Sequence, residues 1–209
     1  MNASSGTSDG NFDRRAEIVR VATALFLEKG YAAASLSRIA EEVGIRKASL
    51  YHHFPSKEAL FVACATDGFE EAVVALAAIR EDPSLTDEER LRRAIAQLYV
   101  INVDSNTGRM SPLIAEVSLR FPEVARAFRK EFIERQHAIL MEILDRGVAR
   151  GSFAAHDRLG VEHVIFGPVV NLCLSRQMFA PCEDLEDWLP VERIRDSHCD
   201  MVLRLVRAG

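Results

Sequence analysis

The sequence predicts an all-α protein with a small N-terminal domain and a larger C-terminal one. Three observations support this fold class. Apolar residues recur at helical spacing along most of the 209 residues, no segment alternates apolar and polar residues as a strand would, and glycines or prolines separate the helical segments. Hydrophobic residues make up 48% of the chain, which is enough for a buried core. We expect about nine helices.

The N-terminal domain is expected at residues 13–60. Its first helix should run from Asp13 to Lys29 and stop at Gly30, because glycine is favoured just past a helix end. Ser35 suits the N-cap of a short second helix that precedes Gly44. A third short helix is expected at 47–53, and Pro55 and Ser56 separate it from a fourth helix that starts at Lys57.

The C-terminal domain is expected at residues 61–209. Thr86 and Glu89 have the spacing of a capping box and predict a helix that runs to about Asp104. Residues 105–112, SNTGRMSP, predict a turn-rich break. Further helices are expected at 112–119, from Pro122 to Gly147 or Gly151, near 157–179 and near 187–207.

Composition restricts the class of protein. No run reaches the roughly 18 apolar residues of a membrane helix. The first residues, MNASSGTSDGN, lack the basic and apolar parts of an export signal, and we expect residues 1–12 to form a disordered tail of a cytoplasmic protein. The net charge is −5, yet residues 13–60 carry +2 and residues 61–209 carry −6. This asymmetry indicates that only the N-terminal domain meets a polyanion.

The stretch GIRKASLYHHF, residues 44–54, predicts how that contact is made. Two short helices joined at a glycine and supported by a preceding amphipathic helix form a helix-turn-helix, whose second helix enters the DNA major groove. Leu50 and Phe54 should face inward. The side chains expected to face outward or to supply hydrogen-bond donors for phosphates and base edges are those of Arg46, Lys47, Ser49, Tyr51, His52, His53 and Lys57.

Two adjacent histidines also raise the alternative of a metal site. Neighbouring residues on a helix diverge by about 100°, so His52 and His53 do not share one ion easily. The positions four residues further on hold Ser56 and Lys57, which are not typical ligands. A catalytic pair lacks a nucleophile and an orienting carboxylate nearby. We therefore expect no metal, no cofactor and no catalytic residues; a solvated basic patch without a partner stays open.

The segment AEIVRVATALFLEKGYAAASLSRIAEEVGIRKASLYHHFPSKEAL, Ala16 to Leu60, resembles the DNA-binding domain of the TetR/AcrR family of regulators. The resemblance implies an all-helical homodimer that binds a palindromic operator in double-stranded DNA. The resulting set of expected DNA-binding residues is Arg14, Ser35, Ser37, Arg38, Arg46, Lys47, Ala48, Ser49, Tyr51, His52, His53 and Lys57.

The sequence departs from the family pattern before the third helix. Many relatives have a Ser or Thr cap there, whereas this chain has Arg46. The cap hydrogen bond, typically worth about 1 kcal/mol, is then lost or supplied otherwise. A long cation at this position suits guanine or phosphate, and Ala48 offers a methyl group to thymine.

The helix VEHVIFGPVVNLCLSRQMF near the C-terminus is apolar nearly all round and should be covered on two sides, one of them by a partner subunit. Pro168, beside Gly167, cannot donate to the carbonyl of Val164, so we expect a kink that either shapes packing or opens a cavity. The expected dimer interface comprises Val170, Leu174, Val191, Ile194, His198, Met201 and Leu205, with His198 as a paired interface histidine. An intramolecular core stripe is the alternative for the last five.

Polar residues that interrupt apolar faces are candidates for an effector pocket. Residues 111–153 resemble the family's ligand-binding half only loosely, so this expectation depends on the residues themselves. The expected lining is Phe69, Asn102, Ile114, Phe132, Gln136, Phe166 and Asn171, and no dense cationic cluster accompanies it. We therefore predict a repressor released by a small apolar or aromatic molecule.

Two other classes of function remain as alternatives. A redox sensor would use Cys182, although Glu183 and Asp184 beside it should disfavour the thiolate. A helical enzyme is the other alternative, but residues 61–209 offer no recognisable set of nucleophile, base and oxyanion donors.

Overall fold

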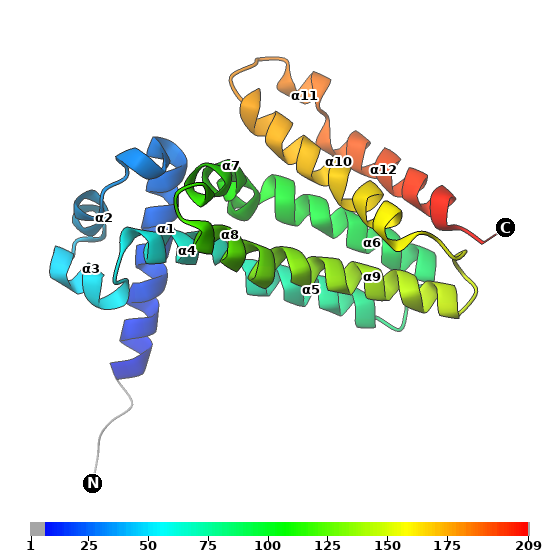
Figure 1. Cartoon of the computed structure of the whole chain (residues 1–209), viewed down its shortest axis with the longest axis horizontal. Helices are drawn as coiled ribbons and strands as arrows, with labels where there is room; N and C mark the ends of the chain where they lie inside the picture. The colour runs from blue at the N-terminus through cyan, green and yellow to red at the C-terminus, as the bar shows by residue number, and fades with distance from the viewer. Residues whose placement is uncertain (1–6, 209) are drawn as a thin grey trace, which may run out of the picture. The chain divides into compact units, whose positions relative to one another are not determined.

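The computed structural model describes residues 7–208, and the side chains of 14–208 except that of residue 107. Helices make up nearly all of this part of the chain, which confirms the predicted all-α class (Figure 1). Within the described range, the one β-type pairing is an isolated bridge between Phe153 and Arg207. No helix in it is both long enough and apolar enough to span a membrane.

The chain divides into two compact units. The first holds the described residues up to Asp67 together with Pro112–Phe128, and the second holds Gly68–Ser111 and the residues from Arg129 onward. The sequence placed the boundary after residue 60. The first unit instead includes all of the fourth helix and a segment that returns to it from the middle of the chain.

The first unit begins with α1 (Thr7–Ala33), α2 (Leu36–Val43), α3 (Lys47–His53) and α4 (Lys57–Thr66). The start predicted at Asp13 is wrong, because α1 already includes residues 7–12; extending a helix adds one hydrogen bond per residue and is easier than starting one. Residues 1–6 of the predicted tail lie outside the described residues. Gly30, at φ 76° and ψ 167°, interrupts α1 where the sequence predicted its end.

Aromatic side chains hold this unit together. Phe26 and Phe61 are fully buried and meet edge to face with ring centroids 5.1 Å apart, while Tyr31 packs against Phe61 at 5.0 Å. Burial of each phenylalanine contributes about 1.5–3 kcal/mol. From the returning segment, α8 (Pro122–Phe128) packs on α4. α4 is thereby fixed to α1 on one side and to α8 on the other.

The second unit begins at a break that the sequence reading missed. The helix expected from Lys57 onward is two helices, because Gly68 adopts a left-handed conformation with φ 80° and α5 (Phe69–Glu81) starts after it. α6 (Asp87–Tyr99) begins with the predicted capping box: Thr86 Oγ1 accepts from Glu89 N at 3.2 Å, and Glu89 Oε2 accepts from Thr86 N at 2.9 Å. A π-helical turn, η1 (Val100–Asp104), continues it.

The break predicted at 105–112 is wrong, because α7 (Asn106–Ser118) includes most of it. Pro112 has no N–H for the carbonyl of Gly108, four residues earlier. Two side chains of α10 (Arg158–Met178) donate to that carbonyl instead: Gln177 Nε2 at 2.9 Å and Cys173 Sγ at 3.4 Å. Gly108 itself is required, since a Cβ there would lie 1.7 Å from the carbonyl oxygen of Asn102.

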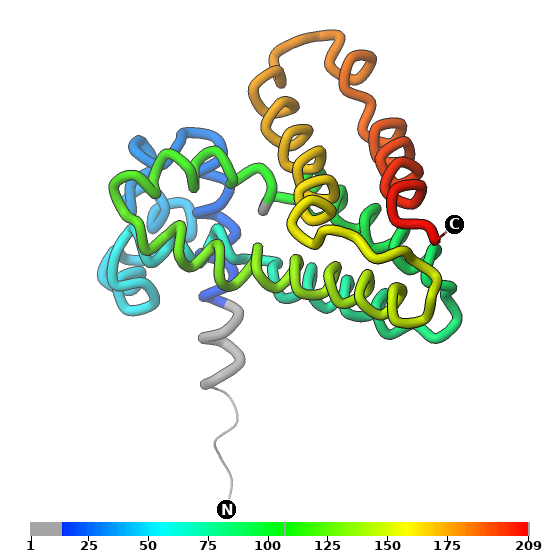
Figure 2. The backbone as a smooth tube through the Cα atoms, turned by 45° about the vertical axis from the view of Figure 1, so that its right-hand side comes forward, coloured from blue at the N-terminus to red at the C-terminus, as the bar shows by residue number. Residues whose placement is uncertain are grey.

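The remaining helices follow the predicted order. After α8, a π-helical turn, η2 (Arg129–Ile133), leads into α9 (Glu134–Ala149), so the long helix predicted from Pro122 is present with this irregularity. α10 (Arg158–Met178) is capped by Asp157, α11 (Leu185–Trp188) is a single turn, and α12 (Val191–Val206) is the last. α10 and α12 run side by side and pack together (Figure 2), and α12 also packs on α6.

The second proline within a helix is accommodated like the first. Pro168 leaves the carbonyl of Val164 without its helical partner, and His198 Nε2 of α12 donates to that oxygen at 2.9 Å. His198 is 2% exposed, and its Nδ1 accepts from the hydroxyl of Tyr99 at 2.9 Å. Burial raises the pKa of Tyr99, which keeps the hydroxyl protonated as the donor, and burial lowers the pKa of His198. His198 therefore links α6, α10 and α12 inside one subunit.

Candidate nucleic-acid interface and effector groove

The outward side chains of α3 are held in place by two buried ones. Leu50 is fully buried and Phe54 nearly so, and the guanidinium of Arg15 lies 4.8 Å from the centre of the Phe54 ring. This fixes the rotation of α3. It exposes the side chains that we call the recognition face: Lys47, Ala48, Ser49, Tyr51 and His52. The sequence predicted these positions as outward, whereas His53 is half-buried.

The turn before α3 depends on a glycine. Gly44 has φ 73°, a left-handed conformation that side chains disfavour, and its N–H bonds to the carbonyl of Glu41 at 3.1 Å. Ile45 N donates to Ala40 O at 2.9 Å and completes the end of α2. The turn thus sets the angle at which α3 leaves α2.

Arg46 occupies the N-cap of α3 without a side-chain cap hydrogen bond. Its carbonyl accepts from Ser49 N at 2.9 Å, so the backbone alone starts the helix. The residue is exposed and immediately precedes α3. Of the two outcomes expected at this position, loss of the side-chain cap or its replacement, the structure shows the loss.

Three of the expected phosphate ligands have partners within the protein. Arg38 pairs with Glu42 at 3.0 Å and Glu41 at 3.2 Å, and Arg14 pairs with Glu17 at 2.7 Å. The ammonium of Lys57 donates to Ala32 O at 3.3 Å and lies 4.4 Å from the centre of the Tyr31 ring. Burial lowers the pKa of Lys57. The sequence showed these cations but not that acidic neighbours and a ring already engage them.

Ser35 and Ser37 flank the start of α2. Ser35 Oγ accepts from Arg38 N at 3.2 Å, which is the predicted cap, and Ser37 is exposed. A hydroxyl that accepts this bond still has its own O–H to donate. His52 and His53 lie with ring centroids 5.8 Å apart in an edge-to-face arrangement. In the described part of the chain, no three histidine, cysteine or acidic side chains are placed to hold a metal ion.

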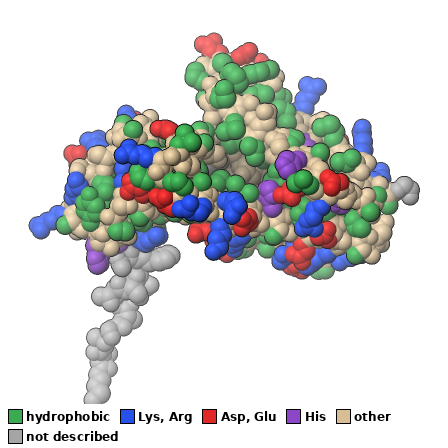
Figure 3. All heavy atoms as spheres, viewed as in Figure 1, with side chains coloured by type: hydrophobic (Ala, Val, Ile, Leu, Met, Phe, Trp, Pro, Cys, Tyr) green, Lys and Arg blue, Asp and Glu red, His purple; other side chains and the backbone are tan. Residues whose placement is uncertain are grey.

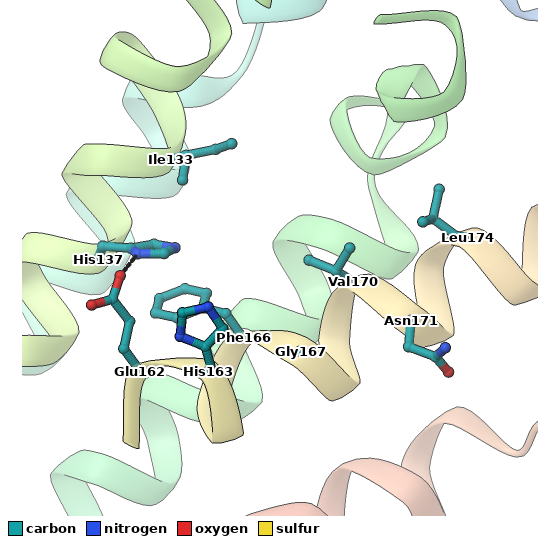
Figure 4. Close-up of a pocket in the computed structure, with 9 residues that line it drawn as sticks. All are labelled: Ile133, His137, Glu162, His163, Phe166, Gly167, Val170, Asn171 and Leu174. Carbon is teal, nitrogen blue, oxygen red and sulfur yellow. Dashed lines mark hydrogen bonds and ion pairs between the residues drawn. The ribbon is translucent and has the colours of Figure 1, made fainter. Parts of the chain in front are cut away.

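The second unit contains an open groove of about 520 Å³ between α9 and α10 (Figure 4). Of the residues expected to line an effector pocket, Phe166 and Asn171 line it, and so do Val170 and Leu174, which were assigned to the dimer interface. The sequence reading missed Ile133, His137, Glu162, His163 and Gly167. The rule that found Asn171, a polar residue within an apolar face, applies equally to His137 and Glu162.

The other expected pocket residues lie outside the groove. Phe69 stacks on Phe132 with ring centroids 4.0 Å apart, and Asn102 Nδ2 donates to Gln136 Oε1 at 3.2 Å. Phe69, Phe132 and Gln136 are buried, and Asn102 is half-buried beside them. Ile114 belongs to the first unit. None of these residues lines this groove, and their role in effector binding stays a prediction.

An apolar stripe on α10 and α12 is left exposed. Val170, Leu174, Met201 and Leu205 are exposed, with Met201 at 57%, while Val191 and Ile194 are half-buried. Charged side chains of both signs are interspersed on the face drawn in Figure 3. The prediction of His198 as an interface histidine is wrong, because it lies beneath this stripe on Tyr99 and Val164.

The cysteines differ in exposure. Cys64, Cys173 and Cys199 are buried, and burial raises the pKa of Cys64 to about 12 and that of Cys199 to about 11. These thiols are therefore protonated at neutral pH. Cys182 is exposed.

An exposed recognition helix on a helix-turn-helix, followed by a helical second unit with a groove, defines a DNA-binding regulator. Residues 18–64 match the family described as "Bacterial regulatory proteins, tetR family". Residues 18–64 therefore form a helix-turn-helix domain of the kind that this family has, and the curated relatives that match along most of the chain are transcriptional regulators.

Relatives of known name match different extents of the chain. The HTH-type transcriptional regulator EthR of Mycobacterium tuberculosis is 25% identical over 187 residues, which cover 88% of this chain and 83% of EthR. The HTH-type transcriptional repressor KstR2 of Rhodococcus jostii is 43% identical over 53 residues, 25% of this chain and 26% of KstR2. A tetR-family regulator from Mesorhizobium loti shares the fold with a TM-score of 0.74 at 22% identity, over 94% of this chain and 98% of that one.

Proposed function

We propose that two copies of this chain bind a palindromic operator and repress transcription, and that a small molecule in the groove between α9 and α10 releases them. The observation that carries the proposal is the recognition face, presented outward over buried Leu50. The name of KstR2, a repressor, supports repression rather than activation. A regulator that binds chromosomal operators acts in the cytoplasm.

The side chains divide by the DNA groups that suit them. Lys47 and His52 extend from the exposed side of α3 and suit base edges, with Ala48 as a methyl contact for thymine. Tyr51, Lys57 and the O–H of Ser35 suit phosphates. Arg46, without a capping role, reaches either guanine or phosphate.

The ion pairs of Arg14 and Arg38 do not prevent phosphate binding. Both pairs are exposed, and solvent screening makes exposed ion pairs weak. A phosphate that neutralises an arginine also releases counterions from DNA, which favours the exchange at low salt. Arg38 therefore acts as a phosphate ligand whose affinity is reduced by Glu41 and Glu42.

The exposed stripe on α10 and α12 is the proposed dimer surface. Four helices, two from each copy, bury Val170, Leu174, Met201 and Leu205 in this arrangement. Twofold symmetry then presents two α3 helices to successive major grooves about 34–36 Å apart. Exposed apolar stripes of this kind typically mark interfaces.

Effector release needs a link from the groove to the helix-turn-helix. α10 lines the groove, and its Cys173 and Gln177 hold the carbonyl of Gly108 at the start of α7. The second half of α7, from Pro112, belongs to the first unit. A displacement of α10 by the effector therefore moves α7, and by linkage the operator weakens effector binding by the same factor.

Selection of genomic fragments by the purified chain tests the DNA-binding part. A recovered palindrome with half-sites about one helical turn apart supports both the recognition face and the dimer. Lys47→Ala and His52→Ala should relax base preference, whereas Tyr51→Ala and Lys57→Ala should weaken binding to all duplexes. Arg93→Ala removes an exposed cation of α6 and serves as the control. Equal losses on cognate and scrambled DNA for all four variants contradict the assignment.

A second candidate function, redox sensing, rests on the exposure of Cys182. Oxidation of this thiol would replace the effector as the signal. A Cys182→Ser variant that still leaves the operator on oxidation ends this candidate.

A further inference from the structure

Three polar side chains gather at one end of the groove between α9 and α10 (Figure 4). His137 comes from α9, and Glu162 and His163 come from α10. The His137 ring stacks on Phe166 with centroids 3.7 Å apart, and its Nδ1 hydrogen-bonds to the Glu162 carboxylate. Asn171 lies toward the other end of the groove, and its amide points away from this cluster.

The existing hydrogen bonds determine what this cluster offers a ligand. A carboxylate only accepts, so His137 Nδ1 is the donor, and Nε2 of the neutral ring is left as an acceptor. His163 Nδ1 bonds to the carbonyl of Leu159 at 2.9 Å, and by the same reasoning its Nε2 is an acceptor. The second carboxylate oxygen of Glu162 also accepts. With neutral imidazoles, the polar end therefore offers hydrogen-bond acceptors only.

Apart from Asn171, the side chains that line the rest of the groove are apolar, and none carries a positive charge. Ile133, Phe166, Val170 and Leu174 form its walls, and none of its nine lining residues is a lysine or arginine. The volume of about 520 Å³ is within the range of small-molecule sites, roughly 300–1,000 Å³. An anionic head group would face Glu162 without a compensating cation, whereas a cationic head would be paired.

We propose that the groove binds an amphiphilic amine: a protonated amino group donates to Glu162 and the two imidazoles, and an apolar or aromatic body lies against Phe166 and Ile133. This inference rests on the proposed function only in that the bound amine acts as the effector. A small molecule, rather than a helix of a second copy, fits the convergence of three acceptors at one end of the groove.

Isothermal titration of the full chain at about pH 8, where imidazole is ordinarily neutral, tests the proposal. The probes are 3,3-diphenylpropylamine, 3,3-diphenylpropan-1-ol and 3,3-diphenylpropionate, which share one apolar body. We expect the amine to bind at least about tenfold more tightly than the carboxylate, equivalent to about 1.4 kcal/mol, with the alcohol between them. Glu162→Gln should abolish the difference between amine and carboxylate. Asn171→Ala, at the opposite end, should preserve it.

Each contrary result overturns the inference. A carboxylate bound as tightly as the amine removes the acceptor argument, and amine binding unchanged in Glu162→Gln removes the role of that carboxylate. Failure of all three probes to bind up to about 1 mM, with the dimer intact, assigns the groove to the subunit interface. These titrations contain no DNA, so a chain that prefers the amine but ignores every operator refutes the proposed function alone. Circular dichroism shows whether Glu162→Gln folds; the half-exposed position of Glu162 favours this.

Discussion

Replacing His198 by leucine removes two hydrogen bonds from the interior of the second unit while keeping a side chain of similar size. The hydroxyl of Tyr99, in a side chain 1% exposed, loses its acceptor, and the part-buried carbonyl of Val164 loses the donor that replaces the missing N–H of Pro168. An unsatisfied buried polar group costs about 1–3 kcal/mol. We expect His198→Leu to lower the free energy of unfolding by about 2–4 kcal/mol, with the partly exposed carbonyl at the low end.

A second substitution separates the two losses. Pro168→Ala restores a backbone N–H four residues after Val164, so the carbonyl regains a helical donor. In that background, His198→Leu should cost only the Tyr99 hydroxyl, about 1–3 kcal/mol, and the double-mutant cycle should give a coupling of about 1 kcal/mol or more. Pro168→Ala alone should not destabilise the protein, because a carbonyl oxygen accepts two hydrogen bonds.

Urea denaturation followed by circular dichroism measures the cycle, at one fixed protein concentration because a dimer gains stability with concentration. A second double-mutant cycle, Tyr99→Phe with His198→Leu, measures the hydrogen bond between the Tyr99 hydroxyl and His198. If His198→Leu costs the same free energy with Pro168 and with alanine there, the histidine does not compensate for the proline and the reasoning is refuted.

Three further predictions concern the same two units. Because burial lowers the pKa of His198, this side chain takes up a proton at higher pH in the unfolded chain than in the folded one. The free energy of unfolding should therefore fall as the pH drops below the ordinary histidine pKa of about 6.5. In denaturation series across that pH range, His198→Leu should show a weaker dependence on pH. Gly108→Ala should destabilise the protein by about 1–3 kcal/mol, because the new Cβ would lie 1.7 Å from the Asn102 carbonyl oxygen. Gly167→Ala should be neutral or stabilising, because its Cβ would meet nothing within 4 Å. Equal changes in melting temperature for the two variants would contradict this. Glu42→Gln should remove one of the two carboxylates that pair with Arg38 and strengthen DNA binding about two- to fivefold at low salt. Fluorescence anisotropy should show this effect disappearing at high salt.

The turns and caps of the helix-turn-helix could be predicted from sequence, because their determinants are local. Gly30 and Gly44 end helices with positive φ, Ser35 caps α2, and Leu50 fixes the rotation of α3. Each of these follows from the residue and its neighbours within one helical turn. What local pattern did not contain was the surroundings of Lys57, since its partners come from the end of α1.

The second unit was predicted less well because its irregularities are satisfied over long sequence distances. Gly108 and Pro112 predict a break, yet Cys173 and Gln177 on α10 supply donors to the Gly108 carbonyl and the helix continues. A pattern within one segment does not show that a distant side chain will complete its hydrogen bonds. The break was wrongly predicted for this reason, and the helix propensities of residues 105–112 do not contain the information that would correct the prediction.

The same physical reason connects the two prolines to the proposed release by an effector. A carbonyl bonded by its own helix has a fixed partner, whereas a carbonyl freed by proline is bonded by whatever side chain another helix provides. Gln177 and Cys173 join α10 to α7 in this way, and His198 joins α12 to α10. These bonds run between helices that line the groove, carry the exposed stripe or continue into the first unit. The two carbonyls that proline leaves without a helical partner, those of Gly108 and Val164, are therefore the points at which we expect one helix to respond to the movement of another. α10 takes part at both points, because it donates to the Gly108 carbonyl and contains Val164.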